Sequence, residues 1–377
     1  MPIRVLFIAR YRDATMRRKV ELLAGEPDLT VAHICPQRWQ DDLLDVRAES
    51  GVINGVPQTA LPMLGRPTDP HRALYRTLSF GLRRFRPDLI HAEEEPESLA
   101  ALQLALARRL FAPRARLVLN TWQNLVRPVK WSVRAVRRFT LRAADAVLCA
   151  NTEAAALLRH QGYPRPAPVL PAIGVDTRVF QPAAALPDHT SFIIGYAGRL
   201  TPEKGLATLL TAVGQLPLSG LPVEVRLIGG GPLRAALEAQ AATLGLAGRV
   251  SFVPALPPAQ LATALQALAV LVLPSHTQPR WKEQFGRVLT EAMACGVPVI
   301  GSSSGAIPEV IGDAGLVFPE GDAAALAAAL ERLRIDPALH AALAAAGLAR
   351  VRAHYTQDVI ATRTAAFYRA LLAGAPA

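Results

Sequence analysis

Short apolar runs alternate with longer segments of helical periodicity along the first half of the chain. The runs expected to be strands are residues 4–9, 29–34, 88–92, 116–121 and 146–150. They have few polar positions, which is typical of strands that are buried on both faces. An apolar segment with a helical repeat, residues 98–110, lies between two of them. This alternation predicts an α/β fold with a parallel sheet and helices on both of its faces.

The same alternation restarts in the second half of the chain. The expected strands are residues 192–197, 223–228, 250–253, 269–273, 297–301 and 316–318. The expected helices are residues 206–216, 232–244, 258–268, 286–295 and 322–333. The pattern therefore predicts two Rossmann-like domains that face a deep cleft, with ligands at the carboxyl ends of the strands beside it.

Periodicity fades over the proline-rich stretch 163–188. Because proline interrupts helices and strands, we place the domain boundary there. The expected division is an N-terminal domain at 1–175, a linker at 176–190 and a C-terminal domain at 191–354. A terminal helix at about 355–377 is expected to pack back on the N-terminal domain.

Composition indicates a folded protein with reduced thiols. Of the 377 residues, 51% are hydrophobic and 19% are charged, which is enough apolar material for two cores. The longest apolar runs are too short to cross a bilayer, and residues 1–9 are typical of a strand and not of a signal peptide. Cys35, Cys149 and Cys295 lie far apart in apolar stretches, so we expect buried free thiols. These features predict a cytoplasmic location.

The net charge of +11 is concentrated in the first half. Residues 1–180 carry 27 Lys and Arg against 17 Asp and Glu, whereas residues 181–377 carry 14 against 13. Helical spacing predicts a cationic stripe formed by Lys130, Arg134, Arg138 and Arg142. Two interpretations remain open: a solvated helix face, or attraction to anionic lipid on the cytoplasmic membrane face. Nucleic acid is not an expected partner, because no recognised binding motif accompanies the charge.

Cations and glycines follow the first two strands of the second half. The stretch 198–205, Gly-Arg-Leu-Thr-Pro-Glu-Lys-Gly, places Arg199 and Lys204 beyond the carboxyl end of a strand. A guanidinium fork and an ammonium there suit phosphate oxygens. The stretch 229–232, Gly-Gly-Gly-Pro, lacks the G-x-G-x-x-G spacing, so by itself it favours a tight strand-to-helix turn.

Glu283 and Glu291 flank the start of an expected helix near Phe285 and Gly286. If Glu283 lay within that helix, the two would be roughly 12 Å apart along the axis and about 80° apart around it. The amide groups at the helix start suit a diphosphate. Carboxylates accept hydrogen bonds from hydroxyls, so Glu291 suits a ribose and Glu283 a transferred sugar. The spacing indicates a site for an activated sugar phosphate.

Together these motifs resemble the GT4-type family of retaining glycosyltransferases (glycosyltransferase group 1). The resemblance covers residues 192–333 and includes the stretch 296–299, Gly-Val-Pro-Val, and the stretch 308–310, Pro-Glu-Val. It implies a GT-B fold and the transfer of a hexose-like sugar from a nucleotide-sugar donor to an acceptor hydroxyl. Together with the basic first half, it favours a lipid-linked or cell-envelope glycan as the acceptor, and a small soluble acceptor is the alternative.

The resemblance implies roles for single residues. Arg199 and Lys204 match residues that hold the donor diphosphate, Glu291 matches the ribose ligand, and Glu283 matches the residue that orients the donor sugar. The implied catalytic residues are Glu283, Arg199 and Lys204. The implied donor-binding residues are Gly198, Arg199, Lys204, Gly230, Val253, Glu283, Phe285, Gly286, Val288 and Glu291.

The N-terminal half matches this family less closely. Many members have a double-glycine loop after the first strand, where this chain has Ala-Arg-Tyr-Arg at 9–12. Many also have a histidine where this chain has Gln123 or Trp122. The acceptor-side candidates are Arg10, Glu94, Gln123 and Asn124. The acidic run 93–95 is interpreted either as solvated loop charge or as a contact to acceptor or sugar. His91 is typical of a structural histidine.

No covalent nucleophile stands out, so the resemblance favours attack by the acceptor from the leaving-group side. No metal or other cofactor is expected, because cations and a helix end serve the diphosphate. The aspartates at 41, 42 and 45 lack supporting ligands for a metal. The alternatives are a non-catalytic GT-B scaffold or membrane-docking subunit, and a GT-B sugar-nucleotide epimerase.

Overall fold

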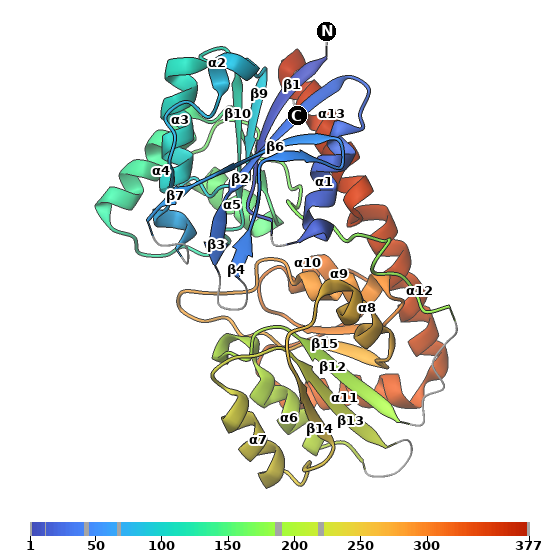
Figure 1. The fold of residues 1–377 in the computed structure, drawn as a ribbon. Coiled ribbons are helices and arrows are strands. Elements are labelled where there is room, and N and C mark those ends of the chain that lie inside the picture. The colour runs from blue at the N-terminus through green and yellow to red at the C-terminus, as the bar shows by residue number, and fades with distance from the viewer. Residues whose placement is uncertain are drawn as a thin grey trace. The chain divides into compact units, whose positions relative to one another are not determined.

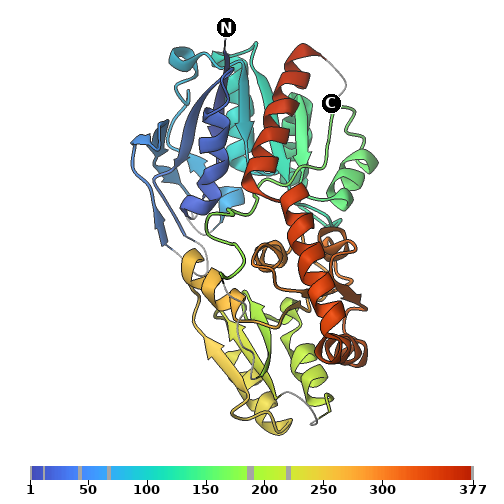
Figure 2. The same ribbon diagram turned by 90° about the vertical axis from the view of Figure 1, so that its right-hand side faces the viewer.

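The protein was analysed as a computed structural model, which describes residues 2–11, 13–40, 45–65, 69–184, 191–217 and 222–374. It divides into two compact units (Figures 1 and 2). The first unit comprises Met1–Gly174 and Gln357–Ala377, and the second comprises Val175–Thr356. The described part of the expected linker, residues 176–184, therefore falls within the second unit.

The first unit contains a seven-stranded sheet with the order β11-β10-β9-β1-β2-β6-β5. Its strands are β1 (Ile3–Ile8), β2 (Leu29–Pro36), β5 (Gly51–Ile53), β6 (Val56–Leu61), β9 (Leu89–Ala92), β10 (Arg116–Thr121) and β11 (Ala146–Cys149). The five strands expected from the apolar runs all form, and they pair in parallel. Smaller elements are β3 (Arg38–Gln40), β4 (Asp45–Arg47), β7 (Met63–Leu64), β8 (Leu74–Tyr75) and η1 (Pro70–Arg72).

One edge of this sheet departs from the parallel prediction. β6 pairs in parallel with β2, but β5 pairs antiparallel with β6. Asn54 and Gly55 join the two strands with φ angles of 49° and 81°, the left-handed geometry of a two-residue hairpin turn. Asn-Gly is a strong hairpin signal, but β5 is short and mostly exposed, so the apolar pattern did not reveal it.

Helices cover both faces of the first sheet (Figures 1 and 2). They are α1 (Ala14–Ala24), α2 (Leu82–Phe85), α3 (Leu99–Phe111), α4 (Trp131–Ala143), α5 (Thr152–His160) and α13 (Gln357–Ala373). Alternate residues of β1 enter two separate cores. Leu6 and Ile8 belong to the core with α3 and α5, whereas Val5 and Phe7 belong to the core with α1 and α13. Burial on both faces explains the continuous apolar run of β1.

The C-terminal helix α13 lies beside α1 in the first unit (Figure 2). Its Tyr368 is fully buried, and the Tyr368 hydroxyl lies 2.5 Å from His91 Nδ1. His91 Nε2 lies 2.6 Å from Asn120 Oδ1. Because an amide oxygen only accepts, Nε2 donates, and Nδ1 accepts from the Tyr368 hydroxyl. Burial holds the pKa of His91 well below its usual value, so His91 is a neutral structural histidine.

We expect Tyr368→Phe to lower the free energy of unfolding by about 1–3 kcal/mol, because it leaves His91 Nδ1 buried without a donor. Urea titration of the variant and the wild type measures this loss. Tyr163→Phe is the matched control: the Tyr163 hydroxyl lies 3.3 Å from Ala144 O, and Arg165 also donates to that carbonyl. An equal loss in both variants would contradict the assignment of the His91 bond.

The second unit contains a six-stranded parallel sheet with the order β14-β13-β12-β15-β16-β17. Its strands are β12 (Phe192–Ala197), β13 (Val223–Ile228), β14 (Val250–Val253), β15 (Val270–Leu273), β16 (Val299–Ser302) and β17 (Leu316–Phe318). Its helices are η2 (Pro202–Lys204), α6 (Leu206–Gly214), α7 (Arg234–Thr243), α8 (Pro258–Gln266), α9 (Arg287–Ala294), α10 (Ile307–Ile311), α11 (Ala323–Ile335) and α12 (Pro337–His354). Helix α6 packs against α7 and α11, and α9 packs against α8 and α12.

All three cysteines are free and buried. Burial raises the pKa of the Cys35 thiol to about 11 and that of the Cys149 thiol to about 12, so these thiols stay protonated at neutral pH. Within the described ranges, no helix combines the length and the hydropathy that a membrane span requires.

Candidate active site

The second sheet has a topological switch point between β12 and β15. After β12 the chain moves outward through β13 and β14, then returns to β15 and continues in the opposite direction through β16 and β17. Connections that leave in opposite directions open a crevice at the carboxyl ends of the two strands, where ligands of such sheets bind. Arg199 and Lys204 follow β12, and Ser275 and Glu283 follow β15. The fold therefore brings these candidates to one place.

Lys204, Glu283 and Ser275 form a buried polar cluster at the switch point. Lys204 Nζ donates to Glu283 Oε2 at 2.7 Å, and Ser275 Oγ donates to the same oxygen at 2.8 Å. The ring of Trp281 lies 4.6 Å from Lys204 Nζ. Both Ser275 and Glu283 are buried. An ammonium and a hydroxyl thus hold the carboxylate in one orientation, at low local dielectric.

The backbone of Glu283 packs against the turn that follows β16. Ala306 N donates to Glu283 O at 3.0 Å, and a Cβ added to Gly305 would lie 2.0 Å from that same oxygen. Glu283 lies before helix α9, which begins at Arg287. The helical spacing considered for Glu283 and Glu291 is therefore wrong, and the turn at Gly305 sets the position of Glu283 instead.

The turn after β12 packs directly on the glycines after β13. Gly198 N donates to Ile228 O at 2.9 Å, and Leu200 N donates to Gly230 O at 2.8 Å. A Cβ added to Gly229, whose φ is +137°, would lie 1.9 Å from Gly198 O. Glycine is needed here because the two turns approach each other so closely. This arrangement supports the interpretation of 229–232 as a tight strand-to-helix turn.

Arg199 and Glu291 each pair with a residue four positions away. Arg199 Nη2 lies 3.2 Å from Glu203 Oε1, and Arg287 Nε lies 2.9 Å from Glu291 Oε1. Both arginines are partly exposed, whereas the Glu291 side chain is only 8% exposed. Arg287 was missed by the sequence analysis, although its spacing from Glu291 on a helix was the available signal.

Helix α9 begins beside this cluster. Gly286 precedes it with a φ of 79° and, as a glycine, has no side chain with which to cap it. Its first-turn amides therefore present a positive dipole end that suits an anion. Phe285 and Val288 are buried, and the Phe285 ring lies 5.6 Å from that of Tyr355. Val253 is the last residue of β14, so it too lies at the carboxyl ends of the strands of the second sheet.

In the first unit, protein groups hold the carboxylates of the acidic run 93–95: ion pairs hold Glu93 and Glu94, and hydrogen bonds hold Glu95. Glu93 Oε1 lies 3.0 Å from Nζ of Lys19, whose side chain is fully buried. Glu94 Oε1 lies 2.8 Å from Arg10 Nη2, and the Glu94 side chain is 4% exposed. Arg10 thus follows β1 and pairs with a carboxylate in the segment that follows β9, the neighbouring strand. The solvated interpretation of this run is wrong.

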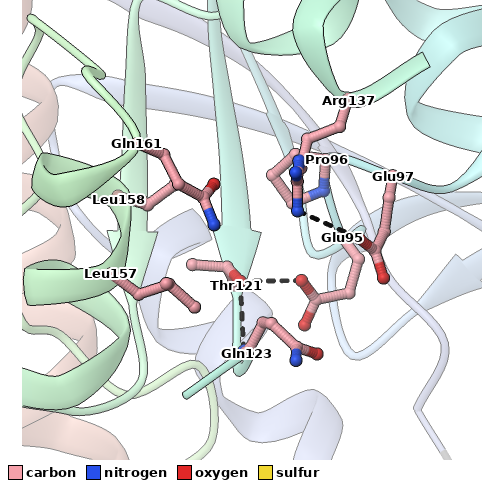
Figure 3. A pocket seen from close by; sticks show the side chains of 9 residues that line it. All are labelled: Glu95, Pro96, Glu97, Thr121, Gln123, Arg137, Leu157, Leu158 and Gln161. Carbon is pink, nitrogen blue, oxygen red and sulfur yellow. Dashed lines mark hydrogen bonds and ion pairs between the residues drawn. The ribbon is translucent and has the colours of Figure 1, made fainter. Parts of the chain in front are cut away.

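Glu95 anchors the end of β10. Thr121 Oγ1 donates to Glu95 Oε2 and Trp122 N donates to Glu95 Oε1, each at 2.7 Å. Figure 3 shows this carboxylate pointing toward Thr121, across a small pocket that Leu157 and Gln161 also line. Burial raises the pKa of Glu95 to about 7.

We expect Glu95 to make the protein less stable as the pH rises from about 5 to about 8. Its pKa rises from 4.5 to about 7 on folding, so the unfolded chain releases this proton at lower pH than the folded chain. Its contribution to the free energy of unfolding therefore falls as pH increases through that window. Urea titrations across the window should show a flatter profile for Glu95→Gln. Asp313→Asn, which removes an exposed carboxylate, is the control. A Glu95→Gln profile as steep as the wild type's would refute the expectation.

Gln123 and Asn124 are held by neighbouring side chains. Gln123 Nε2 donates to Leu125 O at 2.5 Å, and Gln123 Oε1 accepts from Arg127 Nη2 at 2.6 Å. Asn124 is buried and donates to Glu153 Oε2 at 3.0 Å. The structure thus brings Arg10 and Glu94 into contact and places Gln123 and Asn124 on the loop after β10, the strand beside β9.

Of the three aspartates considered for a metal, Asp45 pairs with Arg38 at 2.9 Å, while the other two, at 41 and 42, lie outside the described residues. Among the residues that the structure describes, no group of three or more His, Cys, Asp and Glu side chains is arranged to hold a metal ion.

Comparisons with known proteins agree with this arrangement. A family model described as glycosyl transferases group 1 matches residues 178–350, and a model of a glycosyl transferase 4-like domain matches residues 14–172. A GDP-mannose-dependent alpha-(1-6)-phosphatidylinositol monomannoside mannosyltransferase of Mycolicibacterium smegmatis is 31% identical over 263 residues, 66% of this chain and 68% of that protein. A D-inositol 3-phosphate glycosyltransferase of Segniliparus rotundus is 33% identical over 64% of this chain, and the match spans only 56% of that relative's length.

Two solved structures share the fold over nearly the whole chain. Sucrose-phosphate synthase from Thermosynechococcus elongatus has a TM-score of 0.73 at 24% identity, covering 99% of this chain and 100% of its own. Anabaena HepE in complex with UDP has a TM-score of 0.73 at 18% identity, covering 98% of this chain and 100% of its own. With two parallel-sheet units and both family models matched, the chain belongs to the glycosyl transferases group 1 family and has the GT-B fold.

Proposed function

We propose that this protein transfers a sugar from a nucleotide-sugar donor to an acceptor hydroxyl, with retention of the anomeric configuration and without a metal. The observation that carries the proposal is the buried Glu283 carboxylate, which Lys204 and Ser275 hold at the switch point of the second sheet. A carboxylate beside an ammonium and a helix N-terminus suits a ligand that has hydroxyls at one end and phosphates in the middle.

The second unit has a group for each part of such a donor. Lys204 and Arg199 bind the diphosphate, together with the amides at the start of α9. Glu283 accepts hydrogen bonds from the sugar hydroxyls. Glu291 exchanges the partly exposed Arg287 for the ribose hydroxyls.

The remaining proposed donor contacts come from residues at the carboxyl ends of the strands of the second sheet. Gly198 and Gly230 let the ligand approach the two packed turns closely, because neither has a side chain in the way. Phe285 and Gly286 offer backbone groups to the sugar. Val253 and Val288 supply apolar surface to the nucleoside. Each of these contacts is part of the proposal.

The reaction breaks the bond between the anomeric carbon and the β-phosphate oxygen and forms a bond from that carbon to the acceptor oxygen on the same face. The departing phosphate oxygen takes the acceptor proton. Lys204, Arg199 and the α9 amides stabilise the negative charge that grows on the diphosphate, a preorganised electrostatic effect. In this scheme Glu283 orients the sugar and forms no covalent intermediate.

The proposed acceptor is a lipid-linked or cell-envelope glycan, held by the first unit near Arg10, Glu94, Gln123 and Asn124. Two relatives in the comparisons are named as mannosyltransferases acting on phosphatidylinositol monomannosides, which supports this class. We further propose that the protein works in the cytoplasm, at the cytoplasmic face of an anionic membrane. The excess of basic residues in the first half supports that location.

A panel of nucleotide sugars tests the donor proposal. A donor that binds only the folded state should raise the melting temperature, by an amount that grows with its concentration. Glu291→Ala should reduce that shift. Glu224→Gln should keep it, because Glu224 is an exposed residue near the start of β13, at the end opposite to the proposed site. If no nucleotide sugar stabilises the chain, it is a scaffold and the proposal fails.

The anomeric configuration of the product tests the reaction. NMR of the product formed with a stabilising donor should show the configuration of that donor. An inverted product would end the retaining proposal. Isomerisation of the donor without any acceptor would identify an epimerase instead.

A further inference from the structure

One exposed face of helix α4 has no role in sugar transfer as proposed. It consists of Trp131, Arg134, Arg138 and Arg142, and we call it the α4 surface. All four residues are exposed. At about 100° per residue they occupy one sector of the helix. The opposite side of α4 carries Thr140, which is buried and donates to Pro96 O.

The charge of the α4 surface is uncompensated. Helix α4 contains four arginines and no acidic residue. Arg137 lies outside this surface, and its Nη1 is 3.9 Å from Glu97 Oε2. Within the described part of the chain, the other three arginines have no carboxylate within ion-pair distance. A row of unpaired guanidinium groups on one helix face repels itself, and an anionic surface relieves this repulsion.

Large apolar side chains accompany the charge. Trp131, in the first turn of α4, is 76% exposed, and Val126, just before the helix, is 70% exposed. Lys130 lies between them and is also exposed. An indole ring is stabilised at a membrane interface, where its apolar body meets acyl chains and its N–H stays hydrated. A purely electrostatic partner such as a nucleic-acid duplex would leave Val126 without a contact.

We propose that the α4 surface docks the first unit on an anionic bilayer. Helix α4 lies in the plane of the headgroups, its arginines contact lipid phosphates, and Trp131 and Val126 reach the boundary with the acyl chains. The inference rests on the proposed function, because docking would place the acceptor-side unit at the membrane that holds a lipid-linked acceptor. The docking surface itself shares no residue with the donor site.

Vesicle flotation with the full chain tests this surface. The wild type should bind vesicles of equal parts phosphatidylcholine and phosphatidylglycerol, and not phosphatidylcholine alone. High salt should weaken the binding, because it screens the charges. Replacing Arg134, Arg138 and Arg142 together by glutamine should lower the affinity on the order of 100-fold. Trp131→Ala should lower it about 10-fold and abolish most fluorescence quenching by brominated lipid.

A charge-matched variant distinguishes the effect of the α4 surface on vesicle binding from the effect of the protein's net charge. Arg332, Arg352 and Arg363 are exposed on other helices, and replacing all three by glutamine removes the same charge. This control should bind within about twofold of the wild type. Equal losses in the two triple variants, equal binding to both vesicle types, or tighter binding to duplex DNA than to vesicles would each overturn the proposal.

Donor binding is measured in the same variants by the melting-temperature shift. An intact shift together with lost vesicle binding in the α4 variants supports membrane docking and shows that they remain folded. Vesicle binding that depends on the α4 surface, in a chain that no nucleotide sugar stabilises, would support docking and refute only the proposed transfer.

Discussion

Lys204→Met should lower kcat for sugar transfer by about 100- to 1,000-fold, the typical effect of removing one preorganised charge from the transition state. Methionine keeps an unbranched apolar stem, so the change mainly removes the ammonium, which lies 4.6 Å from the centre of the Trp281 ring. Two effects then add. The departing diphosphate loses a cation, and Glu283 Oε2 loses the ammonium that Lys204 donates to it, while the Ser275 hydroxyl remains. Initial rates at saturating donor and acceptor measure the loss.

Arg280→Ala is the matched control for Lys204→Met. Arg280 is an exposed cation between β15 and α9, so removing it changes the charge of the same loop without touching the buried cluster. Its kcat should stay within about twofold of the wild type. The kcat of Ser275→Ala should lie between those of the other two variants, because Lys204 still holds the Glu283 carboxylate. A folded Lys204→Met protein with a wild-type rate would show that the cluster does not act on the leaving group.

Gly305→Ala should destabilise the protein by about 3 kcal/mol or more and also inactivate it. Gly305 has a φ of +54°, a region that costs alanine about 1–2 kcal/mol. In addition, the new Cβ would lie 2.0 Å from Glu283 O, so the backbone of Glu283 has to move. A shift of about 1 Å at a reacting group can cost about 100-fold in rate. Urea titration and kcat measure the two effects.

Gly321→Ala is the control that measures the cost of backbone strain without the clash that a Cβ at Gly305 makes with Glu283 O. Gly321 has a φ of +83°, but a Cβ there would meet nothing within 4 Å. This variant should lose only the stability that the left-handed backbone costs an alanine, about 1–2 kcal/mol, and its kcat should stay at the wild-type value. If the two alanine variants lose equal stability and both keep wild-type rates, the turn at Gly305 does not set the position of Glu283.

The positions of most parallel strands could be predicted, because these strands form short apolar runs. β12, β13, β14 and β17 have the bounds expected from their apolar runs. The hairpin of β5 and β6 was missed, because these two strands are partly exposed and lack a continuous apolar run. The start of α9 was close to the expected position, since Gly286 marks it. Glu283 lies outside that helix, and only the packing of its carbonyl against Gly305 determines this.

For the site, the sequence by itself determined the donor candidates and their order along the chain, because glycines and charged residues follow strand ends at recognisable spacings. It did not determine which candidates touch. Lys204 and Glu283 are 79 residues apart and meet only because β12 and β15 are neighbours in the sheet. Likewise, an acidic run is typical of solvated charge until Lys19, Arg10 and Thr121 are brought to it by other strands and helices. Tertiary structure decided these pairings because a buried charge is tolerated only where the fold supplies its partner.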